Sequence, residues 1–114
     1  MDYESIRAFC LRLPGVTEEV KWGTDCCFCI GGKMFCVLDT RGDFLVVLKC
    51  TNETFTELCE RKDIAPAPYS GRNQWVAIQN PAAVRDGEWE SLIRTAYGLI
   101  AMKLSNKVKK QLGL

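Results

Sequence analysis

The stretch CCFCIGGKMFCVLD, residues 26–39, decides the fold. It consists of two short β-rich runs on either side of the pair Gly31-Gly32. A third run of the same kind, residues 43–49, follows the connector Thr40-Arg41-Gly42. Glycine-containing connectors of two or three residues favour hairpins. The runs 26–30, 33–39 and 43–49 therefore predict an antiparallel β-meander.

Helical patterns lie on both sides of this meander. Apolar residues recur every three or four positions before Pro14, which predicts an amphipathic helix over residues 3–13. A second helix is expected after the meander, because Thr51 or Asn52 can cap its start. We expect this second helix to end near Lys62.

The C-terminal part of the chain adds one strand and the longest helix. Residues 64–69 contain two prolines and predict an extended connector or a sheet edge, and residues 74–78 predict a strand. The longest helix begins at Asp86 or a neighbour and continues through Leu104, after which Ser105 caps a basic turn or short helix. The expected fold class is α+β, with the meander packed on one face by the N- and C-terminal helices.

The composition is that of one soluble globular domain. Hydrophobic residues make up 47% and charged residues 25% of the 114 residues, so residues 1–114 are expected to form a single domain with a true core. No apolar run approaches the roughly 18 residues that span a bilayer, and the N-terminus carries no signal-peptide pattern. We therefore expect a cytoplasmic protein with no membrane partner, whose seven cysteines stay reduced.

The charges and the missing residue types argue against several functional classes. The chain has no histidine, which removes the commonest general base and the commonest metal ligand. We expect a non-enzymatic protein with no catalytic residues, although lysine, tyrosine or carboxylate chemistry stays open. The net charge of +1 gives no general attraction to nucleic acid, so any such site must be a local patch.

The cysteine cluster contains the CxxC pair Cys26 and Cys29. In an extended strand, positions i and i+3 point to opposite faces, whereas a redox CxxC pair needs a helix N-terminus. A structural zinc site usually needs a second Cys or His pair, and the other cysteines outside the cluster are isolated from one another. These thiols are therefore interpreted as small core residues, and no metal or cofactor is expected.

The segment from Tyr69 to Trp75 carries the most suggestive local chemistry. Two aromatic residues, Arg72 and two amides lie within seven residues of a glycine-containing loop, which suits phosphate binding or stacking on a flat ligand. The alternative is that Tyr69 and Trp75 pack on the sheet while Arg72 and Asn73 are solvated. Lys33, at a turn, and the lysines at 49 and 103 would add to a basic patch only if the fold gathers them.

Six motifs, in order along the chain, resemble the MmcQ/YjbR family. They are Leu13-Pro14-Gly15, Lys21-Trp22-Gly23, Gly31-Gly32-Lys33-Met34-Phe35, Leu48-Lys49-Cys50, Pro66-Ala67-Pro68-Tyr69 with Trp75-Val76, and a terminal helix of the Leu92-Ile93-Arg94, Tyr97, Lys103-Leu104 type. The resemblance runs from residue 3 to residue 112. It implies a fold related to the frataxin (CyaY) type and to a double-wing DNA-binding domain, and members of this family are commonly labelled DNA-binding. The residues that match the family's polar and aromatic signature are Trp22, Lys33, Lys49, Tyr69, Arg72, Trp75 and Lys103.

Two hypotheses about function follow from these features. The first is a DNA-binding module that contacts phosphates through its basic residues and stacks through its aromatic residues. The contacts would come from Lys33, Lys49, Arg72 and Lys103, and the stacking from Tyr69 and Trp75. The second is a frataxin-like, small-molecule or protein-binding module that uses the sheet face or the loop from Tyr69 to Trp75. The chain departs from the family pattern at Cys29, which leaves the exposed sheet face less charged.

Overall fold

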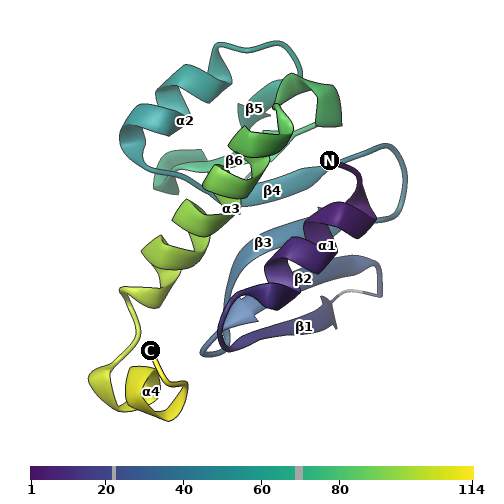
Figure 1. Cartoon of the computed structure of the whole chain (residues 1–114). Helices are drawn as coiled ribbons and strands as arrows, with labels where there is room; N and C mark the ends of the chain where they lie inside the picture. Colours follow the sequence, from purple (N-terminus) through teal and green to yellow (C-terminus); the bar gives the residue numbers. More distant parts are fainter. Residues whose placement is uncertain (22, 69–70) are drawn as a thin grey trace.

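The structure is a computed structural model that describes residues 1–21, 23–68 and 71–114. Six antiparallel strands form one sheet in the order β1-β2-β3-β4-β6-β5 (Figure 1). In chain order they are β1 (Val16–Lys21), β2 (Asp25–Ile30), β3 (Lys33–Asp39), β4 (Val46–Lys49), β5 (Ile64–Pro66) and β6 (Trp75–Ile78). The predicted meander is therefore confirmed as the centre of a larger open sheet.

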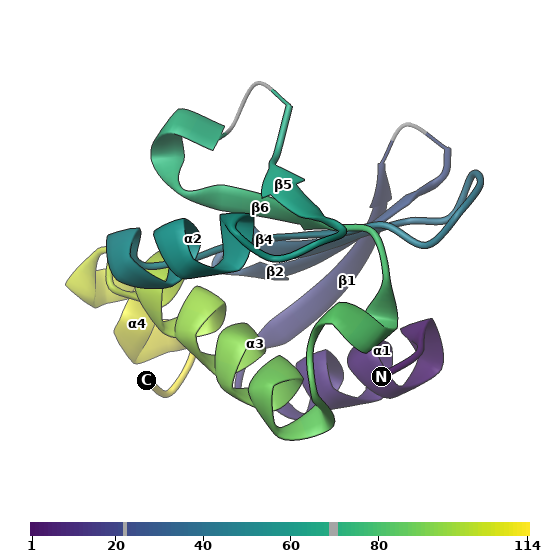
Figure 2. The same cartoon turned by 90° about the horizontal axis from the view of Figure 1, so that it is seen from above.

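Four α-helices are present in the described part of the chain: α1 (Tyr3–Arg12), α2 (Asn52–Cys59), α3 (Asp86–Ala101) and α4 (Asn106–Gln111). Helices α1, α2 and α3 lie on the same face of the sheet (Figure 2). Two short 3-10 helices, η1 (Gly71–Asn73) and η2 (Pro81–Ala83), flank β6. The α+β class and the packing of the terminal helices on one face are as predicted. Within the described ranges, no helix has the length and apolar character needed to cross a membrane.

The core lies between the sheet and these helices. Its largest fully buried side chains include Trp89, Phe28 and Phe35. The pairing of β2 with β3 shifts by one residue between Phe28 and Cys29, so that Phe35 and Cys36 both enter the main core. A bulge of this kind leaves one extra residue on one strand and re-aims its neighbours. A second, smaller cluster forms on the opposite face from Cys27, Cys29 and Val37, with Met34 and Val47 packed against it. We call this opposite side the open face.

One strand was not predicted, and the start of another differs from the sequence prediction by three residues. Strand β1 was not predicted, because its sequence VTEEVK carries two adjacent glutamates and lies at the sheet edge, where one side of the strand is exposed. Strand β4 begins at Val46 rather than at residue 43. The Tyr3 hydroxyl accepts a hydrogen bond from the Leu45 N–H at 2.8 Å and donates one to the Asp39 carbonyl at 2.7 Å, so residues 40–45 form a loop held by α1. Strand β5 is the other edge, as its prolines predicted.

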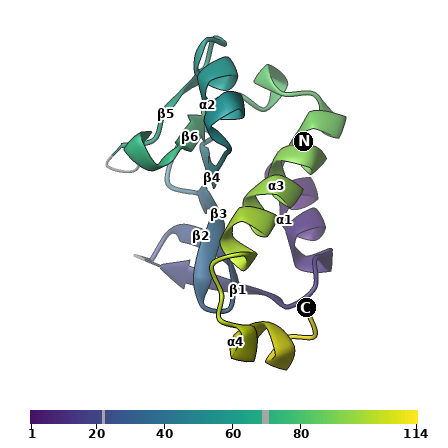
Figure 3. The ribbon, with the colours of Figure 1, turned by 90° about the vertical axis from the view of Figure 1, so that its left-hand side faces the viewer.

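The turn between β2 and β3 fixes the position of the C-terminal helix. Gly31 and Gly32 have φ angles of 59° and 79°, the pair of positive values that a type I′ hairpin turn requires. A Cβ atom at Gly31 would lie 2.6 Å from a Leu104 methyl group and 3.2 Å from a Val108 methyl group. The turn therefore packs directly against the corner between α3 and α4. Figure 3 shows α4 beyond the end of α3, at one end of the sheet.

Candidate functional site

Three of the lysines identified in the sequence lie at one end of the sheet. Lys33 is exposed and begins β3, directly after the turn that contacts the α3–α4 corner. Lys49 ends β4, and because Leu48 pairs with Cys36, it reaches the same end of the sheet as Lys33. Lys103 is exposed and follows the C-terminus of α3 in that corner. We call Lys33, Lys49 and Lys103 the basic end.

Lys49 and Lys103 are close enough to repel each other. Partial burial, followed by the positive charge of Lys103, lowers the pKa of Lys49. The Lys49 ammonium donates a hydrogen bond to the Asn73 carbonyl in η1, which holds it beside the segment that precedes β6. Two cationic groups held near each other, one of them partly desolvated, form a suitable site for an anion that would relieve their repulsion.

No carboxylate among the described residues forms an ion pair with the basic end. The ion pairs between described residues involve other groups, and none includes Lys33, Lys49 or Lys103. Residues 91–114 contain five basic side chains and no aspartate or glutamate. Because the C-terminus of a helix carries partial negative charge, Lys103 also interacts favourably with α3. The interaction with the helix dipole leaves the ammonium group exposed to solvent.

Several acidic side chains lie at the other end of the molecule, where Arg41 and the N-terminal ammonium pair with two of them. Asp39 ends β3, at the opposite end of that strand from Lys33, and Asp86 begins α3. Asp43 and Asp63 line one groove there with Phe44, Leu45 and Gln79. Helix α3 runs from this end to the basic end (Figure 1). Arg61 and Arg85 lie beside Glu88 near the start of α3, so this end carries both signs of charge. The three lysines of the basic end, in contrast, have no ion-pair partner among the described residues.

The aromatic part of the predicted site is placed less favourably. Trp75 pairs with Lys49 across β4 and β6, but it is half-buried and packs against the main core. Trp75 therefore packs on the sheet, which was the alternative to stacking on a flat ligand. Trp22, Tyr69 and the side chain of Arg72 lie outside the described residues. The backbone of Arg72 belongs to η1, which contacts β6.

The cysteine pair lies on opposite faces of β2, as strand geometry predicted. Cys26 packs against the main core, whereas Cys29 belongs to the cluster on the open face. The Cys26 thiol donates to a Glu18 carboxylate oxygen at 2.9 Å, and Arg7 binds the same carboxylate with two hydrogen bonds of 2.8 and 2.9 Å. The described residues contain no group of three or more Cys, Asp or Glu side chains that would hold a metal ion.

The thiol, carboxylate and guanidinium of this network do not form an activated nucleophile. The hydrogen bonds from Arg7 lower the pKa of Glu18, which weakens it as a base. Burial and the hydrogen bond to Glu18 raise the pKa of Cys26 to about 12. A reactive cysteine needs a lowered pKa, because the thiolate is the nucleophile. The network instead links α1 to β1 and β2.

These thiols make the stability of the fold sensitive to alkali. Burial raises the pKa of Cys50 to about 12, as it does for Cys26, from an ordinary value of 9.0. The stabilising contribution of a raised pKa is complete below the unfolded value and is lost as the pH rises through the folded value. We expect the free energy of unfolding to fall between about pH 9 and pH 12, by up to ~1.4 kcal/mol per pH unit for the buried Cys50 and by less for the more accessible Cys26.

Urea denaturation in the presence of a reductant, at neutral pH and at two pH values above 9, measures this effect. The variant Cys50→Ala removes one of these two thiols, so its free energy of unfolding should decrease less steeply with pH. A free energy of unfolding that stays constant up to pH 10.5 would contradict the prediction.

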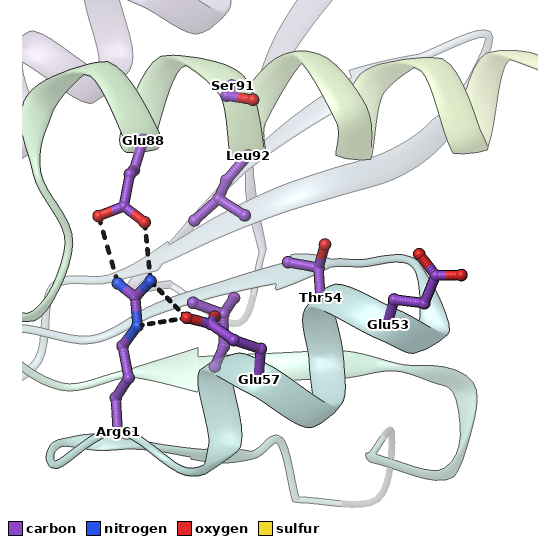
Figure 4. Close-up of a pocket in the computed structure, with 8 residues that line it drawn as sticks. Glu53, Thr54, Glu57, Arg61, Glu88, Ser91 and Leu92 are labelled. Carbon is purple, nitrogen blue, oxygen red and sulfur yellow. Dashed lines mark hydrogen bonds and ion pairs between the residues drawn. The ribbon is translucent and has the colours of Figure 1, made fainter.

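A groove of about 350 Å³ lies between α2 and α3 (Figure 4). Arg61 closes one end of it, with hydrogen bonds to Glu57 at 2.7 Å and to Glu88 at 2.8 Å and a third to the Ala83 carbonyl at 3.1 Å. These contacts occupy the guanidinium and tie α2, η2 and α3 together. The sequence analysis missed this clamp. The spacing of Glu57 and Arg61, which is i to i+4 on α2, was the available signal, but Glu88 is 27 residues away from Arg61.

Comparison with known proteins identifies one matching family model and two solved structures with a similar fold. The family model described as YjbR matches residues 11–99. A Deinococcus radiodurans protein, DR2400, described as a DUF419 domain, is 25% identical with a TM-score of 0.86, and the alignment covers 97% of this chain and 87% of that one. A Pseudomonas syringae protein is 16% identical with a TM-score of 0.72, covering 88% and 99% of the two chains. No curated protein matches the chain. The second similarity shows the fold alone.

Proposed function

The chain belongs to the YjbR family, and from this premise we propose that it is a non-enzymatic, cytoplasmic module that binds DNA through the phosphates at its basic end. The resemblance identified in the sequence is thus confirmed at the level of the family. The observation that supports DNA as the ligand is the convergence of Lys33, Lys49 and Lys103 at one end of the sheet, with no described carboxylate paired to them. Cations that neutralise phosphates supply most of the affinity in sequence-independent binding.

The carboxylates at the other end of the molecule also favour contact with DNA through the basic end. The carboxylates of Asp43 and Asp63, which line one groove at the other end, would be repelled by phosphates, so the protein would approach DNA with its basic end first. The grooves described above, between α2 and α3 and beside Asp43, carry more carboxylates than cations and suit DNA less well. A small-molecule site would be a concave pocket lined largely by apolar and aromatic side chains, and the groove between α2 and α3 has no aromatic lining residue.

Titration of a labelled duplex at about 50 and 200 mM salt tests the proposal. Three lysine–phosphate contacts give a slope of log K against log salt near −3, so we expect a loss of affinity of about fortyfold over this range. Lys49→Gln and Lys103→Gln should each reduce the slope by about 1. Lys62→Gln is the matched control, because Lys62 is exposed and lies before β5, at the other end of the sheet.

Two measurements decide between the outcomes: the slope of log K against log salt, and the effect of the control variant Lys62→Gln. Binding that is absent at about 50 mM salt, or that does not depend on salt, would remove DNA as the ligand. An equal effect of Lys62→Gln would show that the basic end is not the contact surface. A denaturing gel of the incubated duplex should show intact strands, and cleaved strands would contradict a non-enzymatic role.

A further inference from the structure

Met102 is the most exposed large hydrophobic side chain among the described residues, with 74% of its surface accessible. It is the C-cap of α3 and directly precedes Lys103. The buried positions of α3, which include Ile93, Ala96 and Ile100, point toward the sheet. Met102 follows Ile100 by two positions, about 200° around the helix, so it points away from the core. An apolar side chain therefore projects from the basic end.

The corner that carries Met102 is held rigidly. The Met102 N–H donates to the Gly98 carbonyl at 3.0 Å, and the Leu104 N–H donates to the Ala101 carbonyl at 3.1 Å. Leu104 is buried against the turn at Gly31, and the Ser105 side chain accepts from the Val108 N–H to start α4. These contacts fix the backbone on both sides of Met102. The Met102 side chain therefore starts from a defined backbone position, directly before Lys103.

We propose that Met102 is a wedge that inserts between two bases of the bound DNA, while Lys103 and Lys49 hold the phosphates beside it. Apolar side chains, methionine among them, partly unstack a base step when they enter it. The thioether of methionine is unbranched and polarisable, so it fits an irregular gap. Unstacking costs a few kcal/mol per step and costs least where a base is mismatched. The protein should therefore prefer mismatched to fully paired DNA. This inference rests on the proposed function.

The surroundings of Met102 favour a base step over a membrane or a protein surface. An interfacial helix needs a continuous apolar face. The apolar residues of α4 are used inside the molecule, because Val108 packs near Gly31 and Leu112 near Gly15. Met102 is therefore an exposed apolar side chain next to Lys103 that Val108 and Leu112 do not extend into an apolar patch. The space between two stacked bases is narrow and apolar and is flanked by anionic phosphates, so it complements an apolar side chain beside a lysine.

A duplex that carries 2-aminopurine beside a single mismatch tests the wedge. Unstacking of the fluorescent base raises its emission, so the wild-type protein should increase the fluorescence on binding. It should also bind the mismatched duplex about tenfold more tightly than the paired duplex, which corresponds to ~1.4 kcal/mol. Met102→Ala should keep the affinity for the paired duplex and its salt dependence, and should lose both the preference and the fluorescence increase.

Two matched variants complete the experiment. Val20→Ala removes another exposed apolar side chain, 67% accessible, from β1 at a distance from the basic end, and it should behave as the wild type. Met102→Leu keeps an apolar side chain and should keep most of the preference. If the protein binds DNA in a salt-dependent way but shows neither a preference for the mismatched duplex nor a fluorescence increase, the wedge proposal is wrong and the proposed function still holds. An absence of salt-dependent binding overturns both. Binding to anionic vesicles that Met102→Ala weakens, without an effect on DNA, also overturns the wedge.

Discussion

Replacement of Trp89 by alanine will lower the free energy of unfolding by about 3–5 kcal/mol, because it deletes the largest fully buried side chain of the core. The Trp89 ring meets Phe44 edge to face, with ring centroids 6.1 Å apart, and Phe44 stacks on Tyr3 at 4.9 Å. The indole N–H donates to the Pro81 carbonyl at 3.1 Å. Trp89 thus contacts the loop before β4 and η2, and Phe44 connects it to Tyr3 of α1.

Urea denaturation followed by circular dichroism measures the loss. Trp89→Phe is the control, because it keeps much of the ring volume and removes mainly the hydrogen bond to Pro81, which is worth about 1 kcal/mol. The alanine variant should therefore be clearly less stable than the phenylalanine variant. Equal stabilities for the two variants would show that ring volume is not what Trp89 contributes.

Replacement of Gly31 by alanine will destabilise the protein by about 2–5 kcal/mol, more than the same replacement at Gly32. Both glycines have positive φ, and an L-residue in that region costs about 1–2 kcal/mol. A Cβ at Gly31 also meets Leu104 at 2.6 Å, whereas a Cβ at Gly32 meets nothing within 4 Å. The difference between the two variants therefore isolates the contact between the turn and the α3–α4 corner, which overpacking disrupts at a cost of about 1–3 kcal/mol.

Thermal and urea unfolding of the two glycine variants give this difference. Because the corner carries Lys103, Gly31→Ala should also weaken DNA binding under conditions where the variant stays folded, whereas Gly32→Ala should not. If the two variants unfold at the same urea concentration, the packing of the turn on Leu104 contributes nothing to stability.

The clamp around Arg61 illustrates why some contacts escape sequence reasoning. Helix spacing alone predicts the contact between Glu57 and Arg61. The contacts of Arg61 with Glu88 and the Ala83 carbonyl form only because α3 packs beside α2 in the folded chain. Strand β1 escaped for a related reason. Its two glutamates are tolerated because it is an edge strand, where Glu18 is neutralised by Arg7 of α1. Both features depend on a neighbour that is distant in sequence or on another element.

The sequence by itself determined the α+β class, the meander around Gly31-Gly32, the helices at both ends of the chain and the family. These features are local or periodic, because turn chemistry, strand alternation and helical spacing act over a few residues. Only the tertiary structure decided that Lys33, Lys49 and Lys103 meet at one end of the sheet. Their distances depend on strand register and on how α3 crosses the sheet. Coulomb interactions act through space rather than along the chain, so a net charge of +1 is compatible with a basic end.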